Sequence, residues 1–274
     1  MIKLVVTDLD GTFLNNESSF DLELFREVYA QMQQQGIEFV ACTGKQCERV
    51  EKLFEHAGEG IWILGDSATR IKKDGQLIRE FILERERALH AIRLIEQFDT
   101  ELTLIACTSG AAYVKDTISP DLYRVVKGSY QEVIKIGSFV EIREEFLKLT
   151  VFDPLQRSAA LRAHVESELL DTIYIIDSEP RWLDITALHT HKGETVKRLQ
   201  ELLHVTYEQT MAFGDGENDV ELMDIAKYSF AVSNACDNTK RAADWITKSN
   251  EEKGVLLTIQ KMIQLQSAIV PAVK

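Results

Sequence analysis

The sequence predicts an α/β fold in which a doubly wound parallel sheet forms the core and an α+β cap domain is inserted into it. Three observations point to this fold. Short apolar runs rich in β-branched residues alternate with amphipathic helical segments, a rhythm typical of parallel sheets built from right-handed crossovers. The rhythm changes at about residue 80 and resumes after Lys192. The 274 residues also suffice for a core and a smaller second domain.

The first part of the chain predicts three strands joined by two helices. Each expected strand is a short apolar run, as in strands that are buried on both faces of a sheet. Ser18 or Ser19 is expected to cap the first helix, and Gly36 to end it. The second helix is expected to turn Val50 and Phe54 toward the core. The three strands are expected at residues 2–7, 37–41 and 61–64.

The middle of the chain predicts the inserted cap. Two hairpin-like pairs of strands with helices between them favour a compact α+β unit over a continuation of the sheet. An irregular stretch is expected around Pro120. The expected cap elements are helices at 86–98 and 156–169 and strands at 102–106, 112–114, 148–152, 172–176 and 182–185.

The α/β rhythm returns in the last part of the chain. The core domain is therefore expected to be discontinuous, with its first part at residues 1–82, the cap at 83–188 and its second part at 189–274. The last part is expected to hold helices at 193–204, 217–226, 237–243 and 252–266 and strands at 210–213 and 229–232.

The composition excludes several classes of protein. Subtracting 44 acidic from 31 basic residues gives a net charge of −13, which argues against a nucleic-acid partner. No apolar run reaches the roughly 20 residues of a membrane helix, so we expect no membrane association. The cysteines lack metal-site spacing, and reduced thiols indicate a cytoplasmic protein. These cysteines are Cys42, Cys47, Cys107 and Cys236.

Two acidic residues follow the first expected strand. Asp8 and Asp10 lie two apart in the segment Asp8-Leu9-Asp10-Gly11-Thr12, so in extended backbone both carboxylates point the same way. Ligands of open parallel sheets bind beyond the carboxyl ends of the strands, and Gly11 permits a sharp turn there. The alternative is an acidic turn in which one carboxylate only caps the backbone.

A second acidic segment follows the strand expected at 210–213. It reads Gly214-Asp215-Gly216-Glu217-Asn218-Asp219, and alone it could be only the capped start of a helix. Two strands that both end in acidic loops gather four carboxylates at one sheet edge. Two unit charges ~4 Å apart repel by about 4 kcal/mol at an effective dielectric near 20. Such a group needs a cation, and oxygen ligands favour Mg²⁺.

Two further segments could bind an anion. Thr43 and Gly44 follow the second expected strand at the start of a helix, where a hydroxyl and backbone N–H groups can hold phosphate. Thr43 could equally serve only as a helix cap. Lys192 opens the helix that restarts the α/β rhythm. Because a lysine at that end opposes the helix dipole, it indicates an external anion, with a solvated surface lysine as the alternative.

In this order, the four segments resemble the motifs of the haloacid dehalogenase superfamily of phosphotransferases. Residues 8–12 resemble the first motif, Thr43 the second, Lys192 the third and residues 214–219 the fourth. The resemblance implies a Rossmann-like core.

Within that superfamily, the chain resembles the Cof-type sugar-phosphatase branch, subfamily IIB, which carries an α/β cap. The position of the insert, the stretch Ala231-Val232-Ser233-Asn234-Ala235 and the later segment 248–255 carry this resemblance.

The resemblance implies a Mg²⁺-dependent phosphatase of small phosphate monoesters, such as sugar phosphates or phosphorylated cofactors. Asp8 would attack the phosphorus and form an aspartyl-phosphate, and Asp10 would act as general acid and then as general base. The implied metal site comprises Asp8, Asp10 through its backbone carbonyl, Asp215 and Asp219, the last holding a metal-bound water or Lys192. The implied phosphate-binding residues are Leu9, Thr43, Gly44, Lys192 and Asn218.

Two positions depart from the pattern of that branch. Lys45 stands where the branch usually has arginine after Thr-Gly, which replaces a planar fork by a point charge. Asp66-Ser67 stands where Asn-Gly is common. A carboxylate at position 66 would repel an anionic substrate if it faced the site.

Other functions compete with hydrolysis. A phosphomutase would keep the same motifs and reinsert the phosphoryl group. A phospho-accepting signalling receiver also uses acids, a threonine, a lysine and Mg²⁺ on a parallel sheet, but its acids do not flank an insert of about 100 residues. His189 and His191 form an H-x-H pair that could bind zinc, and a surface pair at the domain junction is the preferred interpretation.

Overall fold

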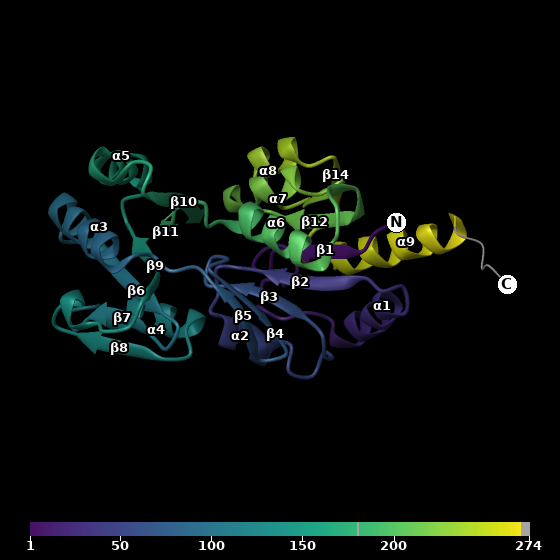
Figure 1. Cartoon of the computed structure of the whole chain (residues 1–274), viewed down its shortest axis with the longest axis horizontal. Helices are drawn as coiled ribbons and strands as arrows, with labels where there is room; N and C mark the ends of the chain where they lie inside the picture. The colour runs from purple at the N-terminus through teal and green to yellow at the C-terminus, as the bar shows by residue number, and fades with distance from the viewer. Residues whose placement is uncertain (180, 270–274) are drawn as a thin grey trace.

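The computed structural model describes residues 1–179 and 181–269. Two sheets, each with its own helices, occupy the two ends of an elongated molecule (Figure 1). In the described residues, the larger sheet has the strand order β14-β13-β12-β1-β2-β3-β4-β5. Its strands are β1 (Leu4–Thr7), β2 (Glu38–Cys42), β3 (Trp62–Gly65), β4 (Arg70–Lys73), β5 (Gln76–Glu80), β12 (Thr210–Gly214), β13 (Tyr228–Val232) and β14 (Trp245–Thr247).

The first strand lies inside this sheet, between β2 and β12. From β14 to β3 all neighbouring strands are parallel, and only β4 and β5 run antiparallel to their neighbours. Thr7, the last residue of β1, pairs with Ala41 of β2 and Phe213 of β12. The loops that follow these three strands therefore leave the sheet at the same edge.

Helices cover both faces of the larger sheet. On β1, Val5 packs into the cluster formed with α1, α2 and α9, whereas Leu4 and Val6 pack into the opposite cluster with α6 and α7. This alternation buries both faces of the strand and confirms the predicted doubly wound α/β core. The helices are α1 (Leu22–Gln34), α2 (Cys47–Leu53), α6 (Lys192–Leu203), α7 (Val220–Asp224), α8 (Asp237–Ala242) and α9 (Gly254–Ile269).

The second sheet forms the predicted cap. Its order in the described chain is β10-β11-β9-β6-β7-β8, antiparallel except for the β7–β8 pair. Helices α3 and α5 pack on one face and α4 on the other. The strands are β6 (Thr103–Thr108), β7 (Ala112–Lys115), β8 (Val133–Ile136), β9 (Phe146–Phe152), β10 (Ile173–Glu179) and β11 (Trp182–Ala187), and the helices are α3 (Arg85–Phe98), α4 (Pro120–Ser129) and α5 (Ser158–Leu169).

All six cap strands fall within residues 83–188. This placement supports our proposal that 83–188 form one domain inserted between core segments 1–82 and 189–274. Of the helices in the described part of the chain, none combines the length and apolar character that crossing a bilayer requires.

Several local expectations were wrong. The stretch around Pro120 is helix α4, because proline fits the first turn of a helix and the Ser119 hydroxyl accepts a hydrogen bond from the Leu122 N–H at 3.2 Å. The cap of α1 is Asp21, whose carboxylate accepts from the Leu24 N–H at 3.0 Å, and not Ser18 or Ser19.

Further differences lie in the core domain. The helix expected at 217–226 is a short 3₁₀ turn, Glu217–Asp219, followed by α7. Strands β4, β5 and β14 were not expected. Each is only three to five residues long, and β5 and β14 expose most of their side chains, so they lack the apolar runs by which the other core strands were recognised. Strand β8 of the cap was not expected either.

Candidate active site

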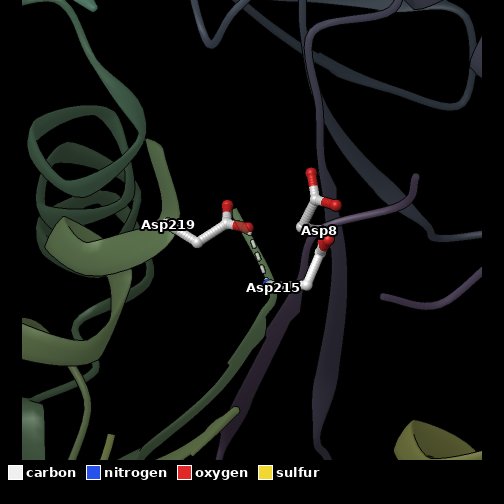
Figure 2. Close-up of side chains that lie close together, drawn as sticks. All are labelled: Asp8, Asp215 and Asp219. Atoms are coloured by element: carbon white, nitrogen blue, oxygen red, sulfur yellow. Dashed lines mark hydrogen bonds between the residues drawn. The ribbon is translucent and has the colours of Figure 1, made fainter. Parts of the chain in front are cut away.

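Three carboxylates converge at the edge of the core sheet where β1 and β12 end. Asp8 follows β1 directly, and Asp215 and Asp219 belong to the loop after β12. Oxygen atoms of all three lie within 4.8 Å of one another. Figure 2 shows Asp8 and Asp215 beside each other, with Asp219 facing them. Two segments some 200 residues apart in sequence thus form one acidic group.

Hydrogen bonds of the backbone and of the side chains hold this arrangement. The Asp8 N–H donates to the Phe213 carbonyl at 3.0 Å, which extends the β1–β12 pairing by one residue. One oxygen of Asp219 accepts from the N–H groups of Asp215 and Gly216, both at 3.0 Å. The Thr12 hydroxyl donates to Asp215 at 2.5 Å. Both loops are therefore tied together before any ligand binds.

Lys192 supplies the cation of this group. Its Nζ donates to Asp8 and to Asp219, each at 2.6 Å, and its side chain is only 4% exposed. Burial alone would lower the pKa of Lys192, but the carboxylates of Asp219 and Asp8 outweigh it and raise this pKa well above its ordinary value. Lys192 is therefore an ammonium that joins the two loops.

One ammonium does not balance three carboxylates. Burial raises the pKa of Asp8 well above its ordinary value, and the charges of Asp219 and Asp215 add to this against the opposing effect of Lys192. Burial and the neighbouring Asp219 raise the pKa of Asp215 to about 6. Oxygens that repel one another in this way form a donor set suited to a divalent cation such as Mg²⁺.

Asp10 stands apart from the buried group. It forms an ion pair with Lys45 at 2.8 Å, and its side chain is 43% exposed. Lys45, which stands where the Cof-type branch usually has arginine, thus lies beside Asp10. Since Asp10 is open to solvent, it can exchange protons with a bound molecule.

A cavity of about 460 Å³ lies between the core and the cap. Of the predicted residues, Asp8, Asp10, Thr43, Gly44, Asp215 and Asn218 line it. Lys192 and Asp219 are buried against Asp8. The Leu9 side chain is fully buried in the hydrophobic core, so a phosphate contact at this position can come only from its backbone.

The cap contributes a polar group that sequence reasoning missed. Lys148 on β9 and Asp184 on β11 lie 3.4 Å apart, and both side chains are almost fully buried at the cavity wall. Thr150 donates to Asp184 at 2.6 Å. The signal was present in the sequence, because a charged residue in the middle of an apolar strand is rare unless it is paired.

The core reaches this cap group through Ser67. Its hydroxyl accepts from Lys148 at 2.7 Å and donates to Asp184 at 2.5 Å. Asp66, Ser67 and Ala68 all have positive φ angles of 54–63°, a strained conformation for residues with a Cβ atom. The strained turn presents Ser67 to the cap, while Asp66 lies buried against Arg70 and does not line the cavity.

The two C-terminal segments of the sequence resemblance support the first acidic loop. Asn234 donates to the carbonyl of Gly11 at 2.7 Å and accepts from the Asn250 N–H at 3.1 Å. Asn250 also donates to the carbonyl of Leu14 at 2.9 Å. Both asparagines therefore fix the turn that follows Asp10.

The alternative interpretation of His189 and His191 as a zinc pair finds no further metal ligands in the part of the chain that the structure describes. Among the described residues, the group of three side chains positioned for a metal is Asp8, Asp215 and Asp219. His191 instead pairs with Glu221 and stacks on Tyr174 of the cap at 4.7 Å. His189 has a positive φ of 58° in the turn before α6.

Comparison with known families agrees with this geometry. The family model of haloacid dehalogenase-like hydrolases matches residues 5–259. The chain belongs to this family. The predicted membership of the haloacid dehalogenase superfamily is thereby confirmed. Membership implies a divalent metal ion, which the carboxylate group fits.

Relatives of this hydrolase cover almost its whole length. A 5-amino-6-(5-phospho-D-ribitylamino)uracil phosphatase, YbjI of Escherichia coli, is 27% identical over 267 residues, which are 96% of this chain and 97% of the relative. The structure of SMU.1108c from Streptococcus mutans has a TM-score of 0.89 at 29% identity and covers 96% of this chain and 100% of its own.

A subclass IIB sugar phosphatase, BT4131, has the same fold. Its TM-score is 0.80 at 19% identity, with coverage of 95% of this chain and 98% of its own. The combination of a parallel core with this kind of cap therefore recurs at low sequence identity.

The substitution Gly11→Ala tests how tightly the hydrolase positions the Asp215 carboxylate. Gly11 has a φ of +77°, and a Cβ atom there would lie 2.5 Å from an Asp215 oxygen. Gly75 has a φ of +76° with nothing within 4 Å. Alanine at either position should lower stability by about 1–2 kcal/mol through strain. Only Gly11→Ala should also lower kcat/KM, by about 100-fold, because it displaces Asp215.

Urea unfolding and steady-state kinetics on both variants check this expectation. Equal activity of the Gly11→Ala and Gly75→Ala enzymes would show that the position of Asp215 tolerates such a shift.

Proposed function

We propose that this hydrolase is a Mg²⁺-dependent phosphatase that acts on small phosphate monoesters. The observation that carries the proposal is the group of three carboxylates, two of them buried, and one buried lysine beside a cavity between the core and the cap. Relatives that include a ribitylaminouracil phosphatase and a sugar phosphatase support it. The substrate is then a small phosphorylated metabolite, and we retain the expectation of a cytoplasmic enzyme.

In this mechanism Asp8 is the nucleophile. Its carboxylate oxygen attacks phosphorus in line with the ester bond, a P–O bond forms to Asp8, and the bond to the leaving oxygen breaks. Lys192, at 2.6 Å, holds the attacking carboxylate in place. The burial and repulsion that raise the pKa of Asp8 also make it a poorly solvated nucleophile.

Asp10 acts first as the general acid and then as the general base. In the first step its carboxyl group donates a proton to the leaving oxygen, so that an alcohol departs. In the second step it accepts a proton from water, which attacks the phosphorus and breaks the bond to Asp8. Its exposure and its place on the cavity wall suit both roles.

The phosphoryl group is bound by residues of the three loops that follow β1, β2 and β12 and by the first residue of α6. The Thr43 hydroxyl, the Gly44 N–H, the backbone of Leu9, the Asn218 side chain and the Lys192 ammonium are the proposed donors. Donors aligned on the three phosphoryl oxygens stabilise the transition state more than the ground state.

Four acidic residues would hold Mg²⁺. Asp8 and Asp215 offer carboxylate oxygens, Asp10 its backbone carbonyl, and Asp219 supports the site through Lys192 and the 215–216 backbone. When bound, the ion supplies charge neutralisation for an anionic phosphate among carboxylates.

Phosphate release from p-nitrophenyl phosphate and from a panel of phosphorylated metabolites tests the proposal. We expect turnover with Mg²⁺ and none after chelation with EDTA. Isomerised sugar phosphate without free phosphate would instead favour a phosphomutase. A long-lived phosphoprotein without turnover would favour a signalling receiver and would refute hydrolysis.

Mg²⁺ should also stabilise the folded chain. At a concentration 100 times the dissociation constant, a ligand that binds only the native state adds about 2.7 kcal/mol, which scanning calorimetry detects as a higher Tm.

The pKa of Asp215, about 6 when folded, lies above that of a free carboxyl group. Lowering the pH through 6 therefore protonates Asp215 in the folded state and stabilises the metal-free chain.

The rise in Tm caused by Mg²⁺ should then be smaller below pH 6, because protons and the ion compete for the same carboxylate oxygens. Asp215→Asn should remove most of this gain at every pH. A Tm that does not respond to Mg²⁺ at pH 7.5 would refute the proposed metal site.

A further inference from the structure

Among the described residues on the cap side of the cavity, the one cation is Lys148, and all of its N–H groups are used. Lys148 Nζ donates to the Ser67 hydroxyl at 2.7 Å, the Gly44 carbonyl at 3.2 Å and the Asp184 carboxylate at 3.4 Å. An ammonium has three donors. With its side chain only 2% exposed, Lys148 has no proton left for a substrate anion.

Asp184, the anion beside Lys148, can still accept a hydrogen bond. One oxygen of Asp184 accepts from Ser67 and Lys148, and the other accepts from Thr150 at 2.6 Å. A carboxylate has about four lone-pair positions, so Asp184 can accept one more hydrogen bond. At the cavity wall it would attract a donor and repel an anion.

The charges of the residues around the cavity also disfavour the binding of a second anion. Among the described residues that line it, the cations are Lys45 and Lys148, and the anions are Asp8, Asp10, Asp184 and Asp215. Lys45 is already paired with Asp10. The net charge of these residues is −2, which one divalent ion would cancel. Among the described residues that line the cavity, neither Lys45, paired with Asp10, nor Lys148 is then free to bind a second anion beyond the phosphate.

The remaining cap wall is largely apolar. Ile105, Val126, Tyr130 and Trp182 line the cavity on this side, and Trp182 packs against Phe152 with ring centroids 4.8 Å apart. Such a wall suits a carbon skeleton or a ring. The hydroxyls of Ser129 and Tyr130 also line it, but they carry no charge that could balance a desolvated anion.

We propose that the enzyme selects phosphate monoesters whose leaving group is uncharged and donates a hydrogen bond, through a hydroxyl or N–H, to Asp184. This inference rests on the proposed phosphatase function and narrows its substrate class. Substrates with a carboxylate or a second phosphate on the leaving group are rejected by the Lys148–Asp184 pair, because Lys148 is neutralised inside the protein and Asp184 repels them.

Matched substrate pairs test this in the wild-type enzyme with Mg²⁺. Glucose 6-phosphate is compared with 6-phosphogluconate, and glycerol 3-phosphate with 3-phosphoglycerate. Each compound is measured as a substrate, by kcat/KM, and as an inhibitor of p-nitrophenyl phosphate hydrolysis. We expect the uncharged member of each pair to be favoured at least about tenfold, the factor that corresponds to 1.4 kcal/mol.

Equal or better use of the carboxylate member would overturn the inference while leaving the phosphatase proposal intact. If no compound, p-nitrophenyl phosphate included, releases phosphate in a Mg²⁺-dependent reaction, both proposals fail together.

The variant Asp184→Asn tests whether Asp184 is responsible for the preference for uncharged leaving groups. The amide removes the negative charge at nearly constant shape and leaves Lys148 uncompensated, so the preference should shift toward the carboxylate substrates by about tenfold or more. Asp177→Asn is the matched control, because Asp177 lies in the same cap sheet but pairs with Arg162 at 3.0 Å and does not line the cavity. An unchanged preference in folded Asp184→Asn enzyme would refute the role of Asp184.

Discussion

Asp8→Asn should lower kcat by about 10⁴-fold or more, the size of loss seen when a catalytic nucleophile is removed. An amide oxygen at this position cannot form the aspartyl-phosphate. The fold should persist, because the substitution removes one of three mutually repelling carboxylates. Steady-state hydrolysis of p-nitrophenyl phosphate measures the loss, and thermal unfolding checks the fold.

Asp10→Asn is the matched comparison. Nitrophenolate leaves without the help of an acid, so the first phosphoryl transfer should survive and give a burst of nitrophenol, followed by slow hydrolysis. Asp8→Asn should give no burst. Turnover at the wild-type rate in Asp8→Asn would refute covalent catalysis by this residue.

Lys192→Met should reduce both activity and stability. The ammonium joins Asp8 to Asp219 at 2.6 Å on each side, and a thioether leaves both carboxylates without their cation. Removing one partner of a buried ion pair lowers stability by about 3–5 kcal/mol. We expect a loss of that size in the free energy of unfolding in urea, and a fall in kcat of at least about 100-fold through lost electrostatic stabilisation.

The control is Lys197→Met on the same helix. Lys197 is 56% exposed and lies 3.9 Å from Glu194, a surface ion pair of the kind worth at most about 1 kcal/mol. Both activity and stability should therefore stay near the wild-type values. If the two lysine variants behave alike, Lys192 does not hold the acidic group together.

Much of the core was predictable because its determinants are local. The apolar run before Asp8 and the run before Gly214 mark two buried strands, and parallel strands must end at a common edge. The convergence of Asp8, Asp215 and Asp219 follows from that topology alone. The start of α6 at Lys192 was equally clear from the returning helical pattern.

The cap side of the cavity was not predictable in the same way. Lys148 and Asp184 meet because β9 and β11 are antiparallel neighbours with Thr150 opposite Asp184, and that register depends on the whole cap sheet. Ser67 reaches them through a turn of three left-handed residues, which no local preference of Asp, Ser or Ala indicates. Helix α4 was missed because an irregular stretch was expected around Pro120, whereas proline fits the first turn of a helix.

The position of β1 has a consequence for biosynthesis. Leu4 pairs with Glu38 on one side but with Thr210 on the other, so a nascent chain exposes one whole edge of its first strand until β12 leaves the ribosome. An unpaired hydrophobic edge is a template for aggregation, and contacts this distant in sequence form slowly. During translation, we therefore expect this edge to be the part of the nascent core most prone to aggregation until β12 pairs with it.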